Sequence, residues 1–300
     1  MPTATCHSEY GRLLEVILHP PENSFQSSRQ IASQWKDLGY RSPPDFELAL
    51  SEYTRFRTLL LACGAREFPM PSDQTTSIDA LYCRDAALPT DFGWIIGRMG
   101  KKARMPENER MEAFIRKQGW PVLGRIREPG TLEGGDLAWL DQKTLLAGIS
   151  YRSNPEGIAQ LRSILKPHGV TVMDFHLPHY RGPQDVFHLM SLLSPVDERK
   201  AVVYAPLLPI PLRKLLLDRD YLFVEVSEPE WSTMACNVLA IAPGECLLLE
   251  GNPCIRDGLL EAGCIVHPFS GHAICLPGGG GPTCLTRPML RESKDFSSVF

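Results

Sequence analysis

Five short apolar runs, each ending at a glycine or proline turn, constrain the fold of this chain more than any other feature. They lie at 14–20, 93–100, 144–150, 201–207 and 246–253. Short apolar runs with such boundaries are typical of buried β-strands. Their spacing predicts alternating strands and helices in about five units of roughly 50 residues, as in a repeat architecture. An open, doubly wound sheet gives the same alternation, so the pattern alone leaves that alternative open.

Amphipathic segments between these runs predict the helices. Segment 106–119 begins with proline and acidic residues and ends with arginine, lysine and glycine, as helix ends prefer. Segment 155–169 follows the same plan, and segment 44–64 stops at a glycine. In this last segment, the apolar positions near a helical period are Phe46, Leu48, Leu50, Tyr53 and Leu59. A second short strand is expected after each helix, at 65–71, 120–126 and 170–178.

Charge and composition exclude several classes of function. The net charge is −4 and the pI about 6.1, so no basic field attracts nucleic acid or an anionic membrane. The most apolar stretch, 204–217, contains three prolines, Arg213 and Lys214, and cannot span a bilayer. The N-terminal stretch lacks the pattern of a signal peptide. We expect a cytoplasmic protein of one domain, residues 1–300, and the sequence leaves a homodimer open.

Nine cysteines occur without any CxxC pair, so a zinc or dithiol motif is not indicated. Cys284 differs from the others because it follows the run GGGGPT. If that run is an ordered loop, its glycines let a substrate or a side chain approach the backbone beside the thiol. The alternative is an inert buried cysteine after a flexible loop. A nucleophilic thiolate would need a base or positive charge nearby.

A histidine and carboxylates that could serve Cys284 lie elsewhere in the chain. His188 lies inside an apolar, strand-like run at 184–197, and His272 is a rival twelve residues before the cysteine. Glu133 and Asp136 flank two glycines at the start of a predicted strand. Buried carboxylates need partners, whereas a solvated hairpin turn would leave the pair exposed.

Two further carboxylates, Asp79 and Asp85, lie in an otherwise apolar stretch. Asp85 follows Arg84 directly, so a surface ion pair is the alternative to a functional site. Each of these signals is weak when it is taken alone.

Their joint appearance resembles the superfamily of guanidine-modifying enzymes, which comprises arginine deiminases, dimethylarginine dimethylaminohydrolases and amidinotransferases. The matching motifs are YCRD (82–85), LEGGD (132–136), GISYRSN (148–154), FHLM (187–190) and GGGPTC (279–284). They occur in the family's order and cover about residues 79–290. The resemblance implies a five-bladed α/β propeller (pentein) with pseudo-fivefold symmetry, in agreement with the five units. It implies no metal and no organic cofactor, and a small guanidine as the substrate.

The resemblance also implies a role for each matching residue. Cys284 would attack the guanidinium carbon and form a covalent thiouronium. His188 would protonate the departing amine and then deprotonate water, and Glu133 would orient His188. Asp85 would hold the guanidinium nitrogens by charge-assisted hydrogen bonds.

Four more residues carry roles by the same resemblance. Asp136 would support the network of Glu133. Arg152 would bind the substrate α-carboxylate, with Arg104 as a second carboxylate ligand. Asp79 corresponds to an aspartate near the substrate α-amino group.

One position departs from the arginine deiminases, which have an aspartate where this chain has Met190. A thioether cannot replace a carboxylate as acceptor, and free arginine would lose a contact worth roughly 1.5–3 kcal/mol. The departure favours a substituted guanidine, as in the dimethylarginine hydrolases, although the GGGP run is closer to the deiminases. A deiminase acting on arginine and an amidinotransferase are the alternatives, and a non-catalytic binding propeller is a third. Thr283 receives no role.

Overall fold

The computed structural model describes residues 4–293, and its strands form five small sheets. The sheet orders are β1-β16-β2-β3, β4-β5-β6, β7-β8-β9, β10-β11-β12 and β13-β14-β15. The strands are β1 (Ala4–Thr5), β2 (Leu13–Leu18), β3 (Arg66–Pro69), β4 (Ala87–Thr90), β5 (Gly93–Ile96), β6 (Val122–Arg125), β7 (Leu137–Asp141), β8 (Thr144–Ile149), β9 (Thr171–His176), β10 (Leu193–Asp197), β11 (Lys200–Val203), β12 (Leu222–Glu225), β13 (Leu239–Ala242), β14 (Glu245–Leu249), β15 (Ile265–Phe269) and β16 (Thr286–Glu292).

Every sheet repeats one connection. An antiparallel pair is followed by a strand parallel to its second member, as in β4–β5 and β5–β6. A parallel connection needs a crossover, which a helix supplies in each unit. These crossover helices are α3 (Phe46–Leu61), α4 (Met105–Lys117), α5 (Pro155–Leu165), α6 (Ile210–Leu217) and α8 (Pro253–Glu261).

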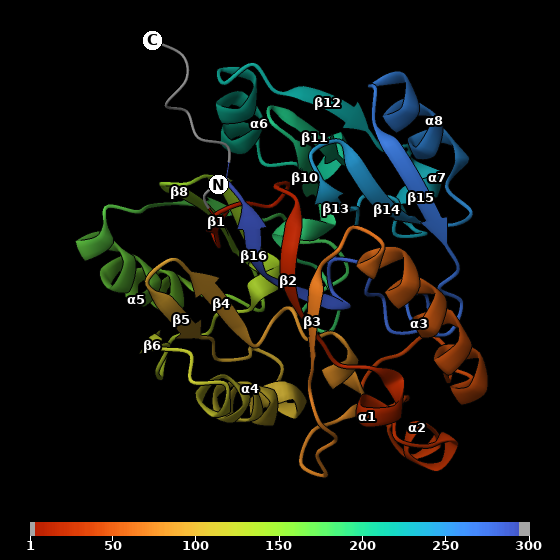
Figure 1. The fold of residues 1–300 in the computed structure, drawn as a ribbon. Coiled ribbons are helices and arrows are strands. Elements are labelled where there is room, and N and C mark those ends of the chain that lie inside the picture. Colours follow the sequence, from red (N-terminus) through yellow and green to blue (C-terminus); the bar gives the residue numbers. More distant parts are fainter. Residues whose placement is uncertain (1–3, 294–300) are drawn as a thin grey trace.

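Figure 1 shows these five helices on the outside of the molecule and β16 and β2 near its middle. The first unit closes the ring with strands from both ends of the chain, because β16 pairs with β2. The predicted five-bladed α/β propeller is therefore confirmed as five small sheets, none of them closed. The open doubly wound sheet is wrong, since the strands do not join into one sheet.

The remaining helical turns are short and lie in the connections. The α-helical ones are α1 (Pro21–Ser24), α2 (Ser28–Gln34) and α7 (Glu228–Trp231). The 3₁₀ turns are η1 (Ile78–Leu81), η2 (Lys102–Arg104), η3 (Gly134–Asp136), η4 (Lys166–His168), η5 (Leu189–Ser191) and η6 (Ala205–Leu207). Among residues 4–293, none of the helices combines the length and apolar character that a membrane crossing requires.

The five apolar runs are strands as predicted, because each contributes its buried residues to the packing between sheet and helix. In the fourth unit, for example, Val202 of β11 and Leu212 of α6 lie in one apolar cluster and are fully buried. The helix starts follow local chemistry, since the carboxylate of Asp45 accepts from the Leu48 N–H and the side-chain amide oxygen of Asn154 accepts from the Gly157 N–H.

The predicted apolar face of α3 is partly wrong. Leu48 is exposed, and the buried face consists of Ala49, Tyr53, Phe56 and Leu60 together with Glu52. The carboxylate of Glu52 accepts hydrogen bonds from the backbone N–H groups of His272, Ala273 and Ile274. A charged residue is therefore buried on this helix because it binds the segment that leads to the glycine-rich loop.

Candidate active site

Five polar side chains, one from each unit, lie just before the first strand of that unit. They are Asp85 before β4, Glu133 before β7, His188 before β10, Asn237 before β13 and Cys284 before β16. The first strands of the units therefore begin at one end of the ring. The sequence-predicted residues Asp85, His188 and Cys284 line one cavity, and Glu133 contacts it through His188.

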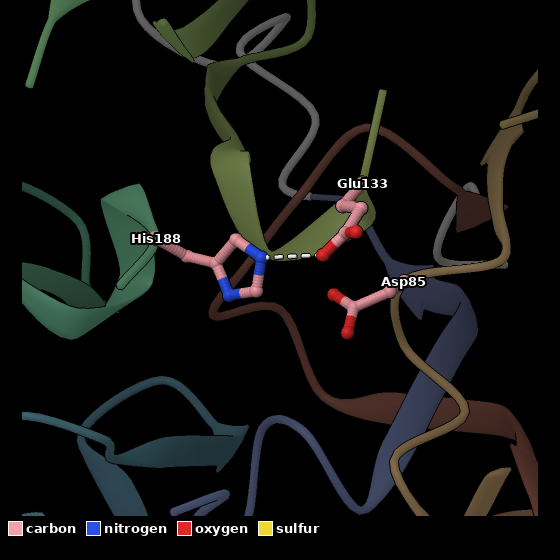
Figure 2. A group of neighbouring side chains, drawn as sticks. All are labelled: Asp85, Glu133 and His188. Carbon is pink, nitrogen blue, oxygen red and sulfur yellow. Dashed lines mark hydrogen bonds and ion pairs between the residues drawn. The ribbon is translucent and has the colours of Figure 1, made fainter. Parts of the chain in front are cut away.

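His188 and Glu133 form a buried pair. The His188 Nε2 atom lies 2.8 Å from Oε2 of Glu133, and both side chains are almost entirely buried. Figure 2 shows the imidazole and the carboxylate pointing toward each other, with Asp85 close by. Because Nε2 donates to a carboxylate, Nδ1 is the nitrogen left to exchange a proton. His188 does not lie within a strand as predicted: it precedes η5, where its N–H donates to the Ser191 hydroxyl.

Charge stabilises the protonated form of this histidine. Burial by itself lowers the pKa of His188, but the charges of Asp136 and Asp85 and the bond to Glu133 outweigh it, so the pKa is raised. Burial likewise opposes ionisation of Glu133, yet His188 and Arg152 hold its pKa well below the usual range. The pair therefore favours an imidazolium beside a carboxylate, which is what a general acid requires.

The other carboxylate oxygen of Glu133 is fixed by the backbone. Its Oε1 accepts from the N–H groups of Gly100 (2.9 Å) and Lys101 (3.3 Å). Gly135 allows the histidine ring to approach, since a Cβ there would lie 2.8 Å from Nδ1. The alternative of a solvated hairpin turn is wrong, because Glu133 and Asp136 are fully buried.

Asp136 holds the backbone next to the histidine. Its Oδ1 accepts from the Leu189 N–H at 3.0 Å and its Oδ2 from the Ser150 hydroxyl at 2.6 Å. Burial raises the pKa of Asp136 to about 6. These contacts fix η5, and through it the direction in which His188 leaves the chain.

Asp85 is buried and binds a guanidinium of the protein itself. Its Oδ2 lies 2.6 Å from Nη1 of Arg104, and its Oδ1 accepts from the Gly135 N–H at 2.8 Å. Arg104 also binds both oxygens of Glu107 and the carbonyl of Tyr82. The surface pair of Asp85 with Arg84 is therefore wrong. Asp85 therefore accepts from a single nitrogen of a guanidinium, whereas Glu107 holds two nitrogens of the same group.

Cys284 is half-buried and has two polar neighbours. The Asn237 amide donates to its Sγ at 3.4 Å, and the Thr283 hydroxyl lies 3.8 Å from it. Burial and the negative charge of Asp85 raise the pKa of Cys284, against the effect of these two hydrogen bonds. The thiol form is thus favoured in this structure, and a further cation close to the sulfur would favour the thiolate.

The glycine-rich run before Cys284 is an ordered loop rather than a flexible linker. A Cβ on Gly278 would lie 2.2 Å from the Tyr82 hydroxyl, and one on Gly280 would lie 2.4 Å from the same ring. A Cβ on Gly281 would meet Asn237 at 2.5 Å. The glycines therefore let the backbone pack directly against Tyr82 and Asn237, which fixes the position of the thiol.

The remaining predicted residues lie in the same polar cavity but have partners in the protein. Arg152 is buried, with Nη1 3.2 Å from Glu133 and Nη2 3.4 Å from the Asp185 carbonyl. Asp79 is buried beside the ammonium of Lys101, at 2.6 Å. Lys101 was not predicted, because a lysine near the start of a helix is ordinary.

A second cavity adjoins the polar one and is mainly apolar. Its lining includes His188 and Cys284 together with Phe187, Met190, Trp231 and Met234. Met190 thus faces the cavity that contains the thiol. Arg41 and Arg181 supply positive charge to the same cavity. His272 lines a separate surface pocket without Cys284, so the structure favours His188 over it.

Asp85, Glu133 and His188 also satisfy the spacing of a metal site, since their ligand atoms lie within 4.8 Å of one another. These atoms already bind one another or Arg104: Nε2 of His188 binds Glu133, and Asp85 binds Arg104. A cation would have to displace that guanidinium. The donor set therefore fits an organic cation held by hydrogen bonds better than a resident metal.

Asn237 is the neighbour of the thiol that sequence reasoning missed. Its carbonyl oxygen accepts from the N–H and the hydroxyl of Thr283, each at 2.9 Å, while its amide faces Cys284. The signal that could have found it is its position, because it precedes β13 as Asp85 precedes β4.

Comparisons with known proteins find similarity to arginine deiminases and to a dimethylarginine dimethylaminohydrolase. A family model described as arginine deiminase matches residues 77–212. An arginine deiminase from Listeria monocytogenes is 26% identical over 254 residues, which are 71% of this chain and 61% of that enzyme. The chain thus matches less than two thirds of that enzyme's length. The dimethylarginine dimethylaminohydrolase of Pseudomonas aeruginosa is 26% identical over 220 residues, covering 73% of this chain and 80% of the relative.

Solved structures share the fold. The same Pseudomonas protein, determined as a mutant with citrulline, has a TM-score of 0.76 at 23% identity and covers 92% of this chain and 99% of its own. The N-terminal domain of ArgZ, an arginine dihydrolase from cyanobacteria, has a TM-score of 0.78 at 19% identity and covers 91% and 96%. These likenesses support the same arrangement of five units.

Proposed function

We propose that this chain, which is similar to arginine deiminases and to a dimethylarginine dimethylaminohydrolase, hydrolyses the guanidinium group of arginine or of a methylated arginine, with a dimethylaminohydrolase-like preference. The products are citrulline and an amine. One observation carries the proposal: Cys284 and His188 line the same cavity as Asp85, and Glu133 binds His188. The five units act together as one catalytic domain in this proposal.

The first half of the reaction makes a carbon–sulfur bond and breaks a carbon–nitrogen bond. A guanidinium bound to Asp85 places positive charge beside Cys284 and so favours the thiolate. The Sγ atom attacks the central carbon, and the departing nitrogen takes a proton from His188. An amine leaves, and a positively charged thiouronium remains on the cysteine.

The second half returns the enzyme to its starting state. Neutral His188 takes a proton from water, and the resulting hydroxide attacks the thiouronium carbon. The carbon–sulfur bond breaks and Cys284 regains its electron pair as thiolate. The added oxygen gives its remaining proton to solvent, and the neutral ureido group is released. Glu133 stabilises the imidazolium that exists at the start and at the end of this cycle.

The preference for a substituted guanidine rests on the apolar cavity. Phe187, Met190 and Trp231 line the apolar cavity, whereas Asp85 and Arg104 line the polar one, and Cys284 lines both. A methylated nitrogen gains from apolar contact there, whereas an unsubstituted nitrogen loses hydrogen bonds to water without replacement. This supports methylated arginine over free arginine.

The proposal also names the residues that bind the amino-acid end of the substrate. Arg152 and, secondarily, Arg104 bind the α-carboxylate, and Asp79 binds the α-amino group. In the structure these side chains bind Glu133, Asp85 and Lys101. Substrate binding therefore has to exchange at least the Asp79–Lys101 contact for a contact with the ligand.

The test is a substrate panel. Purified protein is incubated separately with arginine, monomethylarginine and asymmetric dimethylarginine, and citrulline is measured by a ureido colour reaction. The Cys284→Ala protein is the negative control. Citrulline from methylated arginine, at a rate well above that from arginine, supports the proposal. Citrulline from arginine alone contradicts the preference and indicates a deiminase.

A second arm separates hydrolysis from amidino transfer. Each guanidine is incubated again with an amine such as glycine. Turnover that needs this acceptor contradicts hydrolysis and indicates an amidinotransferase. Absence of turnover together with absence of covalent labelling at Cys284 by 2-chloroacetamidine would indicate a binding protein.

A further inference from the structure

A buried group of charges that the proposed reaction does not use lies inside the ring of sheets. It comprises Glu9, Arg84, Arg287 and Arg291, which are between 0% and 6% exposed. We call it the arginine cluster. Its members come from distant parts of the sequence: Glu9 between β1 and β2, Arg84 ahead of β4, and the other two on β16.

The arginine cluster joins three of the five sheets, since two of its members lie on β16 and others contact β7 and β13. Arg84 Nη2 donates to Glu9 at 2.8 Å, and Glu9 also accepts from the backbone N–H of Trp139 in β7. Arg291 Nη1 donates to the carbonyls of Gly11 and of Ala240 in β13. The cluster therefore lies in the region where the first strands of the units converge.

The charges in this cluster do not balance. Three guanidinium groups face one carboxylate, Glu9. Asp85 is the next acidic group, and its oxygens already accept from Arg104 and Gly135. A guanidinium remains protonated in proteins, so it cannot relieve the imbalance by losing a proton. Burial lowers the pKa of Arg287 to about 9 and that of Arg291 to about 10, which reflects the same lack of compensation.

Hydrogen-bond donors are in excess as well. Nε and Nη1 of Arg84, and Nε and Nη2 of Arg291, are buried without a hydrogen-bond partner among the described residues. Buried donors without acceptors are rare, because each costs roughly 1–3 kcal/mol, and more when the group is charged. A water molecule could accept from two of them but would need acceptors for its own protons. Each oxygen of Glu9 accepts from one donor, Arg84 or Trp139, and the carbonyls of Gly11 and Ala240 accept from Arg291. Because a carboxylate has further lone pairs, ordered water is the competing occupant.

We propose that the arginine cluster is a binding site for a small monovalent inorganic anion of the halide or nitrate class, held between Arg84 and Arg291. Such an anion supplies negative charge and acceptors, and it carries no protons that need partners. A divalent or large anion fits less well, because the surroundings are packed strands.

A cavity lies close to the arginine cluster. This cavity, of about 590 Å³, is lined in part by Gly11, Trp139 and Glu292. Trp139 binds Glu9 through its N–H, and Gly11 binds Arg291 through its carbonyl. These residues separate the cavity from the cluster, and the cavity shares no lining residue with the two that Cys284 lines. An anion entering from this side would not pass the proposed active site.

The direct test is crystallography of the wild-type protein in bromide, with data collected at the bromine absorption edge. The proposal predicts an anomalous peak within hydrogen-bond distance of the free nitrogens of Arg84 and Arg291. Ordered water at this place without an anomalous peak, while bromide appears at surface sites, would overturn it.

A solution test needs no crystals. Thermal unfolding is followed at constant ionic strength while gluconate is replaced by chloride, bromide or nitrate. Binding to the folded state predicts a melting temperature that rises and saturates. The rise should vanish in Arg291→Met and persist in Arg12→Met, whose side chain is exposed and pairs with Glu292. Equal responses in all three proteins, or none in the wild type, would contradict the site. If Arg291→Met does not fold, the bromide experiment decides.

Discussion

Replacing Glu133 by glutamine isolates the contribution of one carboxylate to the proposed proton transfers. The substitution keeps the size of the side chain and leaves one oxygen to accept from Gly100 and Lys101. The amide NH₂ group would then face His188 and Arg152, which are both donors. The charge-assisted bond at 2.8 Å is lost, and nothing in the site replaces it.

The magnitude follows from the type of bond. Hydrogen bonds to charged groups contribute roughly 1.5–3 kcal/mol, and each 1.36 kcal/mol is a factor of ten in rate. We therefore expect kcat to fall about 10- to 150-fold. Removing the charge of Glu133 also lowers the pKa of His188, because that charge is one of the causes that raise it. A general acid must be protonated, so the alkaline limb of the kcat profile should move to lower pH.

The assay is steady-state citrulline formation across pH on the best substrate of the panel. Glu128→Gln is the matched control, because Glu128 is an exposed glutamate that pairs with Arg98. Labelling of Cys284 by 2-chloroacetamidine should survive in Glu133→Gln, which would show that the fold and the cysteine are intact. A kcat within twofold of wild type, with an unshifted pH profile, would refute the proposed role of the pair.

Three other substitutions test separate parts of the site. Asp85→Asn should slow labelling of Cys284 by cationic 2-chloroacetamidine about 10- to 150-fold, because a charge-assisted contact is lost. It should accelerate labelling by neutral iodoacetamide, because the Asp85 charge raises the pKa of Cys284. Changes of both rates in the same direction would contradict this. Met190→Asp should shift the ratio of kcat/KM values toward unsubstituted arginine by a similar factor, and an unchanged ratio would show that Met190 does not contact the substrate. Gly280→Ala should lower the free energy of unfolding by about 1–3 kcal/mol in chemical denaturation, because its Cβ would meet the Tyr82 ring at 2.4 Å; wild-type stability would show that the loop is not packed as described.

Much of the fold could be predicted from the sequence because the repeating unit is local. Apolar runs such as 144–150 and helices such as 155–169 are recognised in the sequence by the spacing of their apolar residues and by the residue types at their ends. Both are present in the structure, as β8 and α5. The buried face of α3 was harder to predict. Leu48 fits an apolar pattern but is exposed, while Glu52 is buried because of backbone groups about 220 residues away.

The site residues that belong to sequence motifs could be predicted. The residues that come together only in the tertiary structure could not. The order of EGGD, FHL and GGGPTC singled out Glu133, His188 and Cys284, which the structure brings to one end of the ring. The secondary structure around His188 could not be inferred, since an apolar run does not reveal a 3₁₀ turn inside it. The arginine cluster could not be predicted either, because no sequence motif links positions 9, 84 and 291.

The covalent role of Cys284 is the central claim, and one measurement tests it most directly. The enzyme is quenched with acid within the first turnover of its best guanidine substrate, digested, and its cysteine peptides are weighed by mass spectrometry. The account predicts the mass of a thiouronium on the peptide that contains Cys284. Product formation at the full single-turnover rate by Cys284→Ala, or an adduct on another cysteine in its place, would contradict it.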